Sequence, residues 1–221
     1  MSRTGSSRLA GRIVVVTAGG TREPIDPVRY LGNRSSGKMG HAIAVAAADR
    51  GAQVRLITTV TAPDDERIAT VKVDTAAEMN TAVRAALPGA MLLVMAAAVA
   101  DYRVAEVAAK KMKKRDALTL DLVPTVDILR SLAGDPLGES VLVVGFAAET
   151  DNIEENAVRK LAEKRLDLVV LNDVSRADIG LGSHDNEVRV FDSGGLVAHL
   201  EKRAKPLVAS ALLDLIEKRL S

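Results

Sequence analysis

The sequence contains no cysteine and no tryptophan, and its aromatic residues are limited to two tyrosines and two phenylalanines. The absence of cysteine excludes a disulfide framework and a thiolate metal site, and it agrees with the reducing cytoplasm that we expect as its location. We expect no nucleic-acid partner, because 30 Lys and Arg nearly balance 29 Asp and Glu and aromatic rings for stacking are scarce. No apolar run approaches the ~18 residues that span a bilayer, so we expect no membrane segment.

The residues that are present predict an α/β fold. With 221 residues, the chain can form one large domain or two small ones around an aliphatic core. Apolar, β-branched runs predict strands at residues 13–17, 53–58, 91–95, 141–146 and 168–171. Helical patterns lie at residues 40–50, 76–87, 126–133 and 153–165. Strands that are apolar throughout indicate a sheet covered on both faces, so we predict a Rossmann-like, doubly wound, mostly parallel sheet.

The C-terminal part follows a different pattern. Residues 187–191 and 196–200 alternate in polarity around a turn at residues 192–195, which predicts a β-hairpin. The amphipathic residues 205–220 predict a closing helix. We assign residues 1–10 to a flexible lead-in or linker and residues 11–221 to the domain.

A long polar loop, residues 17–40, follows the first predicted strand and reads TAGGTREPIDPVRYLGNRSSGKMG. It brings Ser35, Ser36 and Gly37 to a helix start, where free backbone N–H groups and the helix dipole favour phosphate. An ordinary helix capped by serine explains the same residues equally well. We interpret the GxxxxGK match at residues 32–38 as accidental, because Met39 replaces the Ser or Thr that binds Mg²⁺ in a P-loop.

Small and polar residues also follow the third predicted strand, at the edge where open α/β sheets bind ligands. Ala97 and Ala98 would let a ligand approach the backbone. Asp101 could hold a metal, a ribose or a base amino group, or it could cap a helix. A dinucleotide site would need GxGxxG after the first strand and an acidic residue after the second, and the absence of both argues against NAD.

Three lysine-rich or aromatic features remain. Residues 110–115 carry five positive charges in six positions, which is typical of a solvated surface or of a lid, residues 105–116, that neutralises a polyphosphate. Phe146 is a core residue by default, or a platform for a base. Lys160 and Lys164 share one helix face, where surface pairing with glutamates is the simplest account. The three histidines are scattered and show no metal-ligand or catalytic-triad spacing.

Four motifs occur in order along the chain: the loop of residues 17–40, AAVADYRV followed by KKMKK, VGFAAETDN, and LDLVVLNDVS. Together they closely resemble phosphopantothenoylcysteine synthetase, which in bacteria is commonly the C-terminal half of a bifunctional coenzyme A biosynthesis protein. The resemblance covers nearly the whole chain. It implies a homodimer with active sites near the subunit interface, and fusion to or association with an N-terminal flavin-dependent decarboxylase domain.

The resemblance also implies a CTP-dependent ligase that joins 4′-phosphopantothenate to the amine of L-cysteine, with Mg²⁺ accompanying CTP. The carboxylate displaces pyrophosphate from CTP, and the cysteine amine then displaces CMP from the acyl-cytidylate. Asn33 is expected to act on the acyl-cytidylate carbonyl, and Lys111 to neutralise phosphate from the lid. The expected nucleotide contacts are Asp101, Lys111, Val126, Asp127, Ile128, Leu129, Phe146, Lys160 and Lys164. The expected phosphate or substrate contacts are Ser35, Ser36, Gly37, Ala97 and Ala98.

One departure and two alternatives accompany this resemblance. Residues 125–128 match a turn that often reads Asn-Pro-Asp-Ile in relatives, and Val126 stands where they have proline. A non-catalytic nucleotide-binding or sensing domain would use the same loops without turnover. An NAD(P)-dependent reductase is the second alternative, which the missing glycine fingerprint disfavours.

Overall fold

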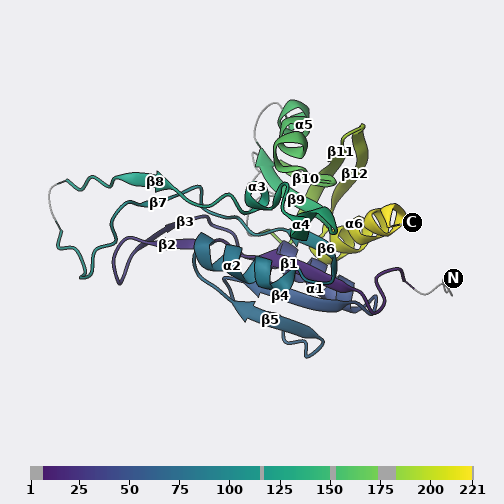
Figure 1. Ribbon diagram of the computed structural model, residues 1–221, viewed down its shortest axis with the longest axis horizontal. Coiled ribbons are helices and arrows are strands. Elements are labelled where there is room, and N and C mark those ends of the chain that lie inside the picture. The colour runs from purple at the N-terminus through teal and green to yellow at the C-terminus, as the bar shows by residue number, and fades with distance from the viewer. Residues whose placement is uncertain (1–6, 115–116, 150–152, 174–182, 221) are drawn as a thin grey trace.

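The computed structural model describes residues 7–114, 117–149, 153–173 and 183–220. Its centre is an eight-stranded sheet in the order β12-β11-β10-β9-β6-β1-β4-β5 (Figure 1). These strands are β1 (Ile13–Ala18), β4 (Gln53–Thr58), β5 (Ile68–Lys72), β6 (Ala90–Met95), β9 (Leu142–Glu149), β10 (Leu168–Asp173), β11 (Asp185–Asp192) and β12 (Gly195–Ala204). β11 runs antiparallel to both neighbours, and the other neighbouring strands run parallel. The predicted mostly parallel sheet with a C-terminal hairpin and helix is therefore confirmed.

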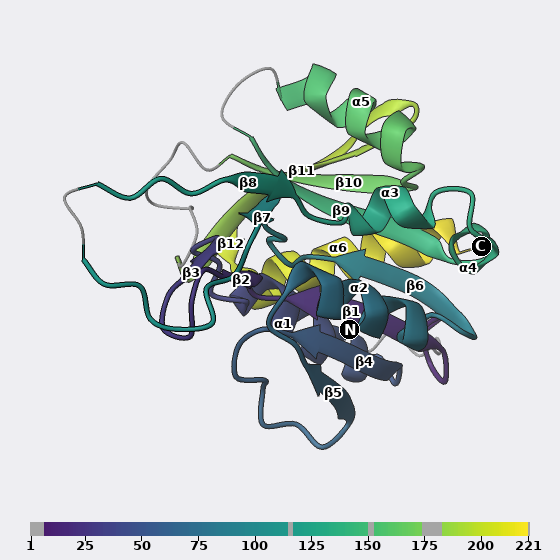
Figure 2. The same cartoon turned by 60° about the vertical axis from the view of Figure 1, so that its left-hand side comes forward.

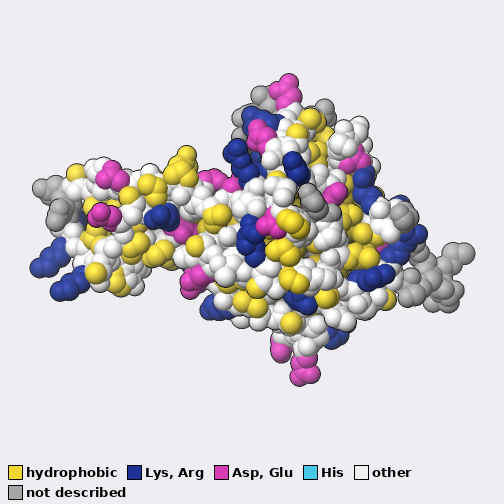
Figure 3. All heavy atoms as spheres, in the orientation of Figure 1, with side chains coloured by type: hydrophobic (Ala, Val, Ile, Leu, Met, Phe, Trp, Pro, Cys, Tyr) yellow, Lys and Arg dark blue, Asp and Glu magenta, His cyan; other side chains and the backbone are white. Residues whose placement is uncertain are grey.

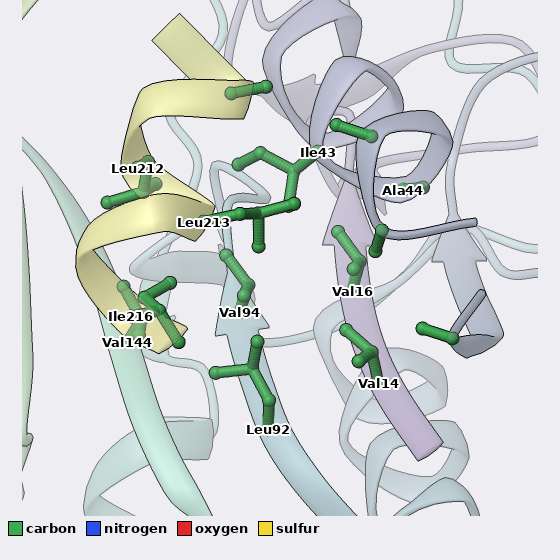
Figure 4. Close-up of a cluster of buried hydrophobic side chains, with 14 of the residues drawn as sticks. Val14, Val16, Ile43, Ala44, Leu92, Val94, Val144, Leu212, Leu213 and Ile216 are labelled. Atoms are coloured by element: carbon green, nitrogen blue, oxygen red, sulfur yellow. The ribbon is translucent and has the colours of Figure 1, made fainter. Parts of the chain in front are cut away.

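Helices cover both faces of the sheet, as the apolar strands require. α1 (Lys38–Ala48) and α6 (Lys205–Arg219) lie on one face, where Ile43 and Leu213 pack with Val14 and Val16 of β1 (Figure 4). The other face carries α2 (Ala76–Ala86), α3 (Ile128–Leu132), the short α4 (Pro136–Glu139) and α5 (Ile153–Lys164). Val15 faces this second layer. Within the lead-in assigned to residues 1–10, Leu9 is fully buried in the main core.

Gly40 lets α1 lie directly on the end of β1. A Cβ atom there would be 2.6 Å from the carbonyl oxygen of Thr17 and 2.7 Å from the Cβ of Ala18. On an exposed helix Gly→Ala stabilises by about 1 kcal/mol. At this contact we expect Gly40→Ala to lower the free energy of unfolding by about 2 kcal/mol, because the helix must move off the strand.

Urea unfolding of Gly40→Ala measures this effect directly. Gly194→Ala is the matched control, because its nearest contact is the side-chain oxygen of Asp192 at 3.2 Å and no backbone atom. A midpoint for Gly40→Ala equal to or above that of the unsubstituted chain would contradict the close contact.

Several strands of the sheet end at the same edge. The parallel strands β1, β6, β9 and β10 all end there, and β12 ends there too because β11 reverses the direction of the chain. α6 therefore begins at the same edge as α1, against which it packs. We call this the carboxyl edge.

An arm projects from the carboxyl edge (Figures 1 and 2). It is built from two antiparallel ribbons, β2 (Arg22–Pro24) with β3 (Tyr30–Gly32) and β7 (Tyr102–Val104) with β8 (Leu122–Pro124). Lysine and arginine side chains gather at its far end (Figure 3). The described part of the expected lid, residues 105–114, belongs to this arm. No helix among the described residues has the length and apolar composition needed to cross a bilayer.

Candidate functional site

A cleft of about 560 Å³ opens at the carboxyl edge. It lies between the start of α1, the segments that follow β6 and β8, the end of β9, and α5. Of the site residues expected from the sequence, all except Lys111 line this cleft. They are Asn33, Ser35, Ser36, Gly37, Ala97, Ala98, Asp101, Val126, Asp127, Ile128, Leu129, Phe146, Lys160 and Lys164. Residues spread over five segments of the sequence thus meet in one place.

Asn33 is held at the rim by the segment that follows β6. Its Nδ2 donates to the carbonyl oxygens of Ala98 (3.3 Å) and Val99 (3.2 Å). The backbone brings the two segments together, because Gly20 pairs with Ala98 and a Cβ at Gly20 would be 2.5 Å from the Asn33 carbonyl oxygen. Both amide protons of Asn33 are therefore engaged within the protein, and its exposed side chain stands at a fixed place beside the cleft.

The start of α1 is capped by glycine. Gly37 is the N-cap residue, with φ of 75°, and no side-chain hydrogen bond caps this helix within the part of the chain that the structure describes. The alternative of an ordinary serine cap is therefore wrong for this helix. Helical N–H groups that have no side-chain cap are donors for an anion, and the helix dipole adds to the attraction. Burial lowers the pKa of the nearby His41, so positive charge at this turn comes from Lys38.

The turn before α3 joins two other walls of the cleft. Asp127 caps α3 by accepting a hydrogen bond from the Arg130 N–H (3.1 Å), and its carboxylate pairs with Lys164 of α5 at 3.1 Å. Thr125 binds the segment after β6, since its hydroxyl donates to the Ala100 carbonyl at 2.5 Å. The helix starts at Ile128 rather than at the expected residue 126, because Asp127 is its cap.

Asp101 and Phe146 were each given two interpretations. Asp101 is exposed at the cleft and is followed by β7, so it does not cap a helix. Phe146 is half-buried, packs on the main core and also faces the cleft. Both side chains therefore remain available to a ligand, and their contacts with nucleotide stay a prediction.

Lys111 lies on the arm, exposed and outside the set of residues that line the cleft. Its neighbour Met112 is anchored to the loop between β2 and β3. The Met112 N–H donates to Asp26 (3.1 Å), and its carbonyl oxygen accepts from Arg29 (2.8 Å). Arg29 also donates twice to the buried carboxylate of Asp26, at 3.0 and 2.5 Å. Asp26 and Arg29 therefore form a clasp that ties the basic loop, residues 110–114, to the loop between β2 and β3.

The charge of Asp26 is secured by its partners. The Arg29 guanidinium holds the pKa of this carboxyl far below its usual range, burial acts in the opposite direction, and the N–H groups of Val28, Met112 and Arg29 lower the pKa further. A depressed carboxyl pKa stabilises the folded form above the unfolded pKa, and this stabilisation disappears only as the pH falls through the folded value. The clasp is therefore intact throughout the neutral range.

We expect Asp26→Asn to release the basic loop. Trypsin should then cleave after the lysines of residues 110–114 about tenfold faster, because cleavage follows the population of the open form. Asp65→Asn is the control, since it breaks a similar pair with Arg67 that involves no residue of the arm. Equal cleavage rates in the unsubstituted chain and Asp26→Asn would show that the clasp does not hold the loop.

Five polar residues at the cleft were not named among the expected site residues: Lys38, Thr125, Asn172, Asn186 and Lys205. Asn172 follows the apolar residues 168–171, so the rule that found Asp101 could have found it. Its Oδ1 is buried and has no hydrogen-bond partner within the described residues. Asn186 and Lys205 reach the cleft only through the reversal of β11, which no local pattern announces.

The described residues of the cleft do not form a complete metal cage. Among the described residues, no group of three or more His, Asp or Glu side chains could hold an ion. Mg²⁺ usually binds through one or two carboxylates together with substrate phosphates. Asp101 is an exposed carboxylate at the cleft, whereas Asp127 is already engaged, so the residues fit a Mg²⁺ ion that arrives with a phosphate ligand.

Comparison with known proteins identifies relatives over almost the whole chain. Residues 9–220 match the family model of the DNA/pantothenate metabolism flavoprotein C-terminal domain. The coenzyme A biosynthesis bifunctional protein CoaBC of Escherichia coli K12 is 46% identical over 212 residues, which are 93% of this chain and 52% of that protein. CoaBC of Bacillus subtilis is 44% identical over 207 residues, or 92% of this chain and 49% of that protein. The chain thus spans about half the length of these relatives.

Solved structures show the same fold. The crystal structure of the C-terminal domain of CoaBC superimposes with a TM-score of 0.80 at 38% identity, covering 97% of this chain and 98% of that one. A Cab2 mutant in complex with phosphopantothenate-cysteine superimposes with a TM-score of 0.72 at 17% identity, covering 94% and 87%. At that identity the second likeness concerns the fold alone.

Proposed function

Because this chain belongs to the DNA/pantothenate metabolism flavoprotein C-terminal domain family and resembles the synthetase half of CoaBC, we propose that it is a phosphopantothenate–cysteine ligase of coenzyme A biosynthesis. The observation that carries the proposal is the cleft itself. Motifs far apart in the sequence converge there, at the edge where open α/β sheets bind ligands.

The proposed reaction needs an activated carboxylate, because a free carboxylate is a poor acyl donor. The carboxylate of 4′-phosphopantothenate attacks the α-phosphate of CTP, and pyrophosphate leaves with the electrons of the broken P–O bond. The amine of L-cysteine then attacks the acyl carbon, loses a proton and displaces CMP. Negative charge builds up on phosphate oxygens in the first step, so the protein is expected to supply cations and N–H donors there.

The described residues offer these groups on several sides. The glycine-capped first turn of α1, with Ser35 and Ser36 before it, supplies N–H donors for a phosphate. Lys160 and Lys164 extend from α5, and the ion pair with Asp127 fixes the direction of Lys164. Phe146 presents a ring on which a cytosine can pack. Val126, Ile128 and Leu129 add apolar contacts and backbone groups beside the nucleotide.

Mg²⁺ would be held by Asp101 and by the phosphates of CTP, and it would neutralise charge on the leaving pyrophosphate. Asn33 would stand beside the acyl group, since the carbonyls of residues 98 and 99 fix it at the rim. Ala97 and Ala98 leave room for the substrate against the backbone. The chain would act as a homodimer, with Lys111 carried to a cleft by the arm.

Formation of 4′-phosphopantothenoylcysteine, followed by mass spectrometry, tests this function. We expect product with CTP and Mg²⁺, much less with ATP, and none without nucleotide. A chain that binds CTP without making product would be the non-catalytic nucleotide-binding domain instead. Stabilisation of the fold by NADPH and not by CTP in a thermal-shift assay would favour the reductase.

A further inference from the structure

Lys205 is a buried lysine in the wall of the cleft that has no role in the mechanism above. It begins α6 and reaches the cleft because β12 returns the chain to the carboxyl edge (Figure 1). α6 packs along α1 on the same face of the sheet, so Lys205 and Lys38 both start helices at this edge. Only 7% of Lys205 is exposed, which is unusual for a lysine.

The ammonium group of Lys205 has a neutral partner and a cationic neighbour. Its Nζ donates to the carbonyl oxygen of Ser183 at 2.5 Å, and it forms no ion pair within the described part of the chain. Burial lowers the pKa of Lys205, the charge of Lys38 lowers it further, and Asp185 acts in the opposite direction. Burying an ammonium group whose hydrogen-bond partner is a neutral carbonyl is costly, and an anion bound beside it would lower that cost.

We propose that Lys205, Lys38 and the N–H groups of the first turn of α1 form a subsite for a phosphate group. The inference rests on the proposed ligase function, in which both CTP and 4′-phosphopantothenate carry phosphate. The subsite lies on the α1 and α6 face, whereas Lys160 and Lys164 come from α5 on the opposite face. The cleft thus carries cations on both flanks, which suits two phosphate-bearing substrates.

Lys205→Met tests the subsite, because methionine keeps the apolar stem and removes the charge. Calorimetric titration is done with pyrophosphate, CTP, CMP and 4′-phosphopantothenate at fixed ionic strength. We expect the affinity for at least one phosphate ligand to fall at least about tenfold, as loss of a charge-assisted hydrogen bond predicts. Lys205→Arg should retain most of the affinity. Lys72→Met, an exposed lysine on β5, is the matched control and should change nothing.

The pattern of losses identifies the phosphate. Weaker binding of pyrophosphate and CTP, with CMP and 4′-phosphopantothenate unchanged, assigns the subsite to the terminal phosphates of the nucleotide. Weaker binding of 4′-phosphopantothenate alone assigns it to the phosphate of that substrate. Unchanged affinity of folded Lys205→Met for every probe overturns the proposal, and so does a Lys205→Arg variant that binds as weakly as Lys205→Met.

If Lys205→Met does not fold, Lys38→Met must weaken the binding of a phosphate ligand, and unchanged binding in that variant refutes the subsite.

Two further results distinguish failure of the subsite from failure of the ligase function. Pyrophosphate binding that depends on Lys205 in a chain without ligase activity would keep the subsite and refute the ligase. Normal ligation and normal binding in Lys205→Met would keep the ligase and refute the subsite.

Discussion

Replacing Asn33 by aspartate should leave a protein that still releases pyrophosphate from CTP but forms ligated product about 100-fold more slowly. The side chains have the same shape, so binding of the nucleotide should persist. The change removes the two N–H groups of Nδ2 and places a carboxylate against the carbonyl oxygens of Ala98 and Val99. The carboxylate at position 33 would then repel these two carbonyl oxygens. The rim of the cleft would move away from the segment after β6, at the point where the acyl carbonyl must be held.

Rapid-quench kinetics separates the two half-reactions of Asn33→Asp. We expect one equivalent of pyrophosphate to form in a burst, followed by slow appearance of CMP. The control is Asn80→Asp on α2, where the side chain acts through its Oδ1 as an acceptor for Ser131, a role that aspartate keeps. Loss of the burst itself would contradict the assignment and would make Asn33 a nucleotide-binding residue.

Lys111→Ala should slow the first half-reaction about 100-fold, because it removes a positive charge from the step in which pyrophosphate leaves. Lys113→Ala is the matched control, since Lys113 is an exposed lysine on the same loop. Pyrophosphate release in the absence of cysteine measures this step. A rate near that of the unsubstituted chain would show that Lys111 does not act on the nucleotide.

The position of Lys111 means that this prediction requires a movement of the arm. The clasp at Asp26 and Arg29 holds its neighbour on the arm, and Lys111 is outside the cleft. If Lys111 acts on the nucleotide as predicted, the arm must bring it to a cleft when ligands bind, either in its own chain or in a second copy. Mixing Lys111→Ala with Asn33→Asp distinguishes the two, because only exchange of arms between copies creates a site without either substitution.

The central strands could be predicted because each is a continuous apolar run, as in residues 13–17 and 53–58. β5 was missed because it lies at the edge of the sheet and buries Ile68 alone, so its sequence has no apolar run. The arm ribbons were missed for a similar reason, since they are three residues long and largely exposed. Strands are recognised in a sequence by runs of buried apolar residues, and these strands bury few residues.

The lining of the cleft was predictable where a residue lies near the carboxyl end of a recognisable strand or belongs to a recognised motif. Asp101 and Phe146 are of this kind. Lys205 and Asn186 are not, because they enter the site through pairing between β10, β11 and β12, which depends on the whole sheet. The glycine cap of α1 was also hidden, because serine at positions 35 and 36 offers the commoner cap.

Pyrophosphate release with CTP, Mg²⁺ and 4′-phosphopantothenate, measured with and without L-cysteine, tests the proposed ligase most directly. We expect release that requires 4′-phosphopantothenate but not cysteine, stops near one equivalent per site, and becomes continuous with CMP and ligated product once cysteine is added. Release that does not need 4′-phosphopantothenate, or none with either CTP or ATP, would contradict activation of the carboxylate in this cleft.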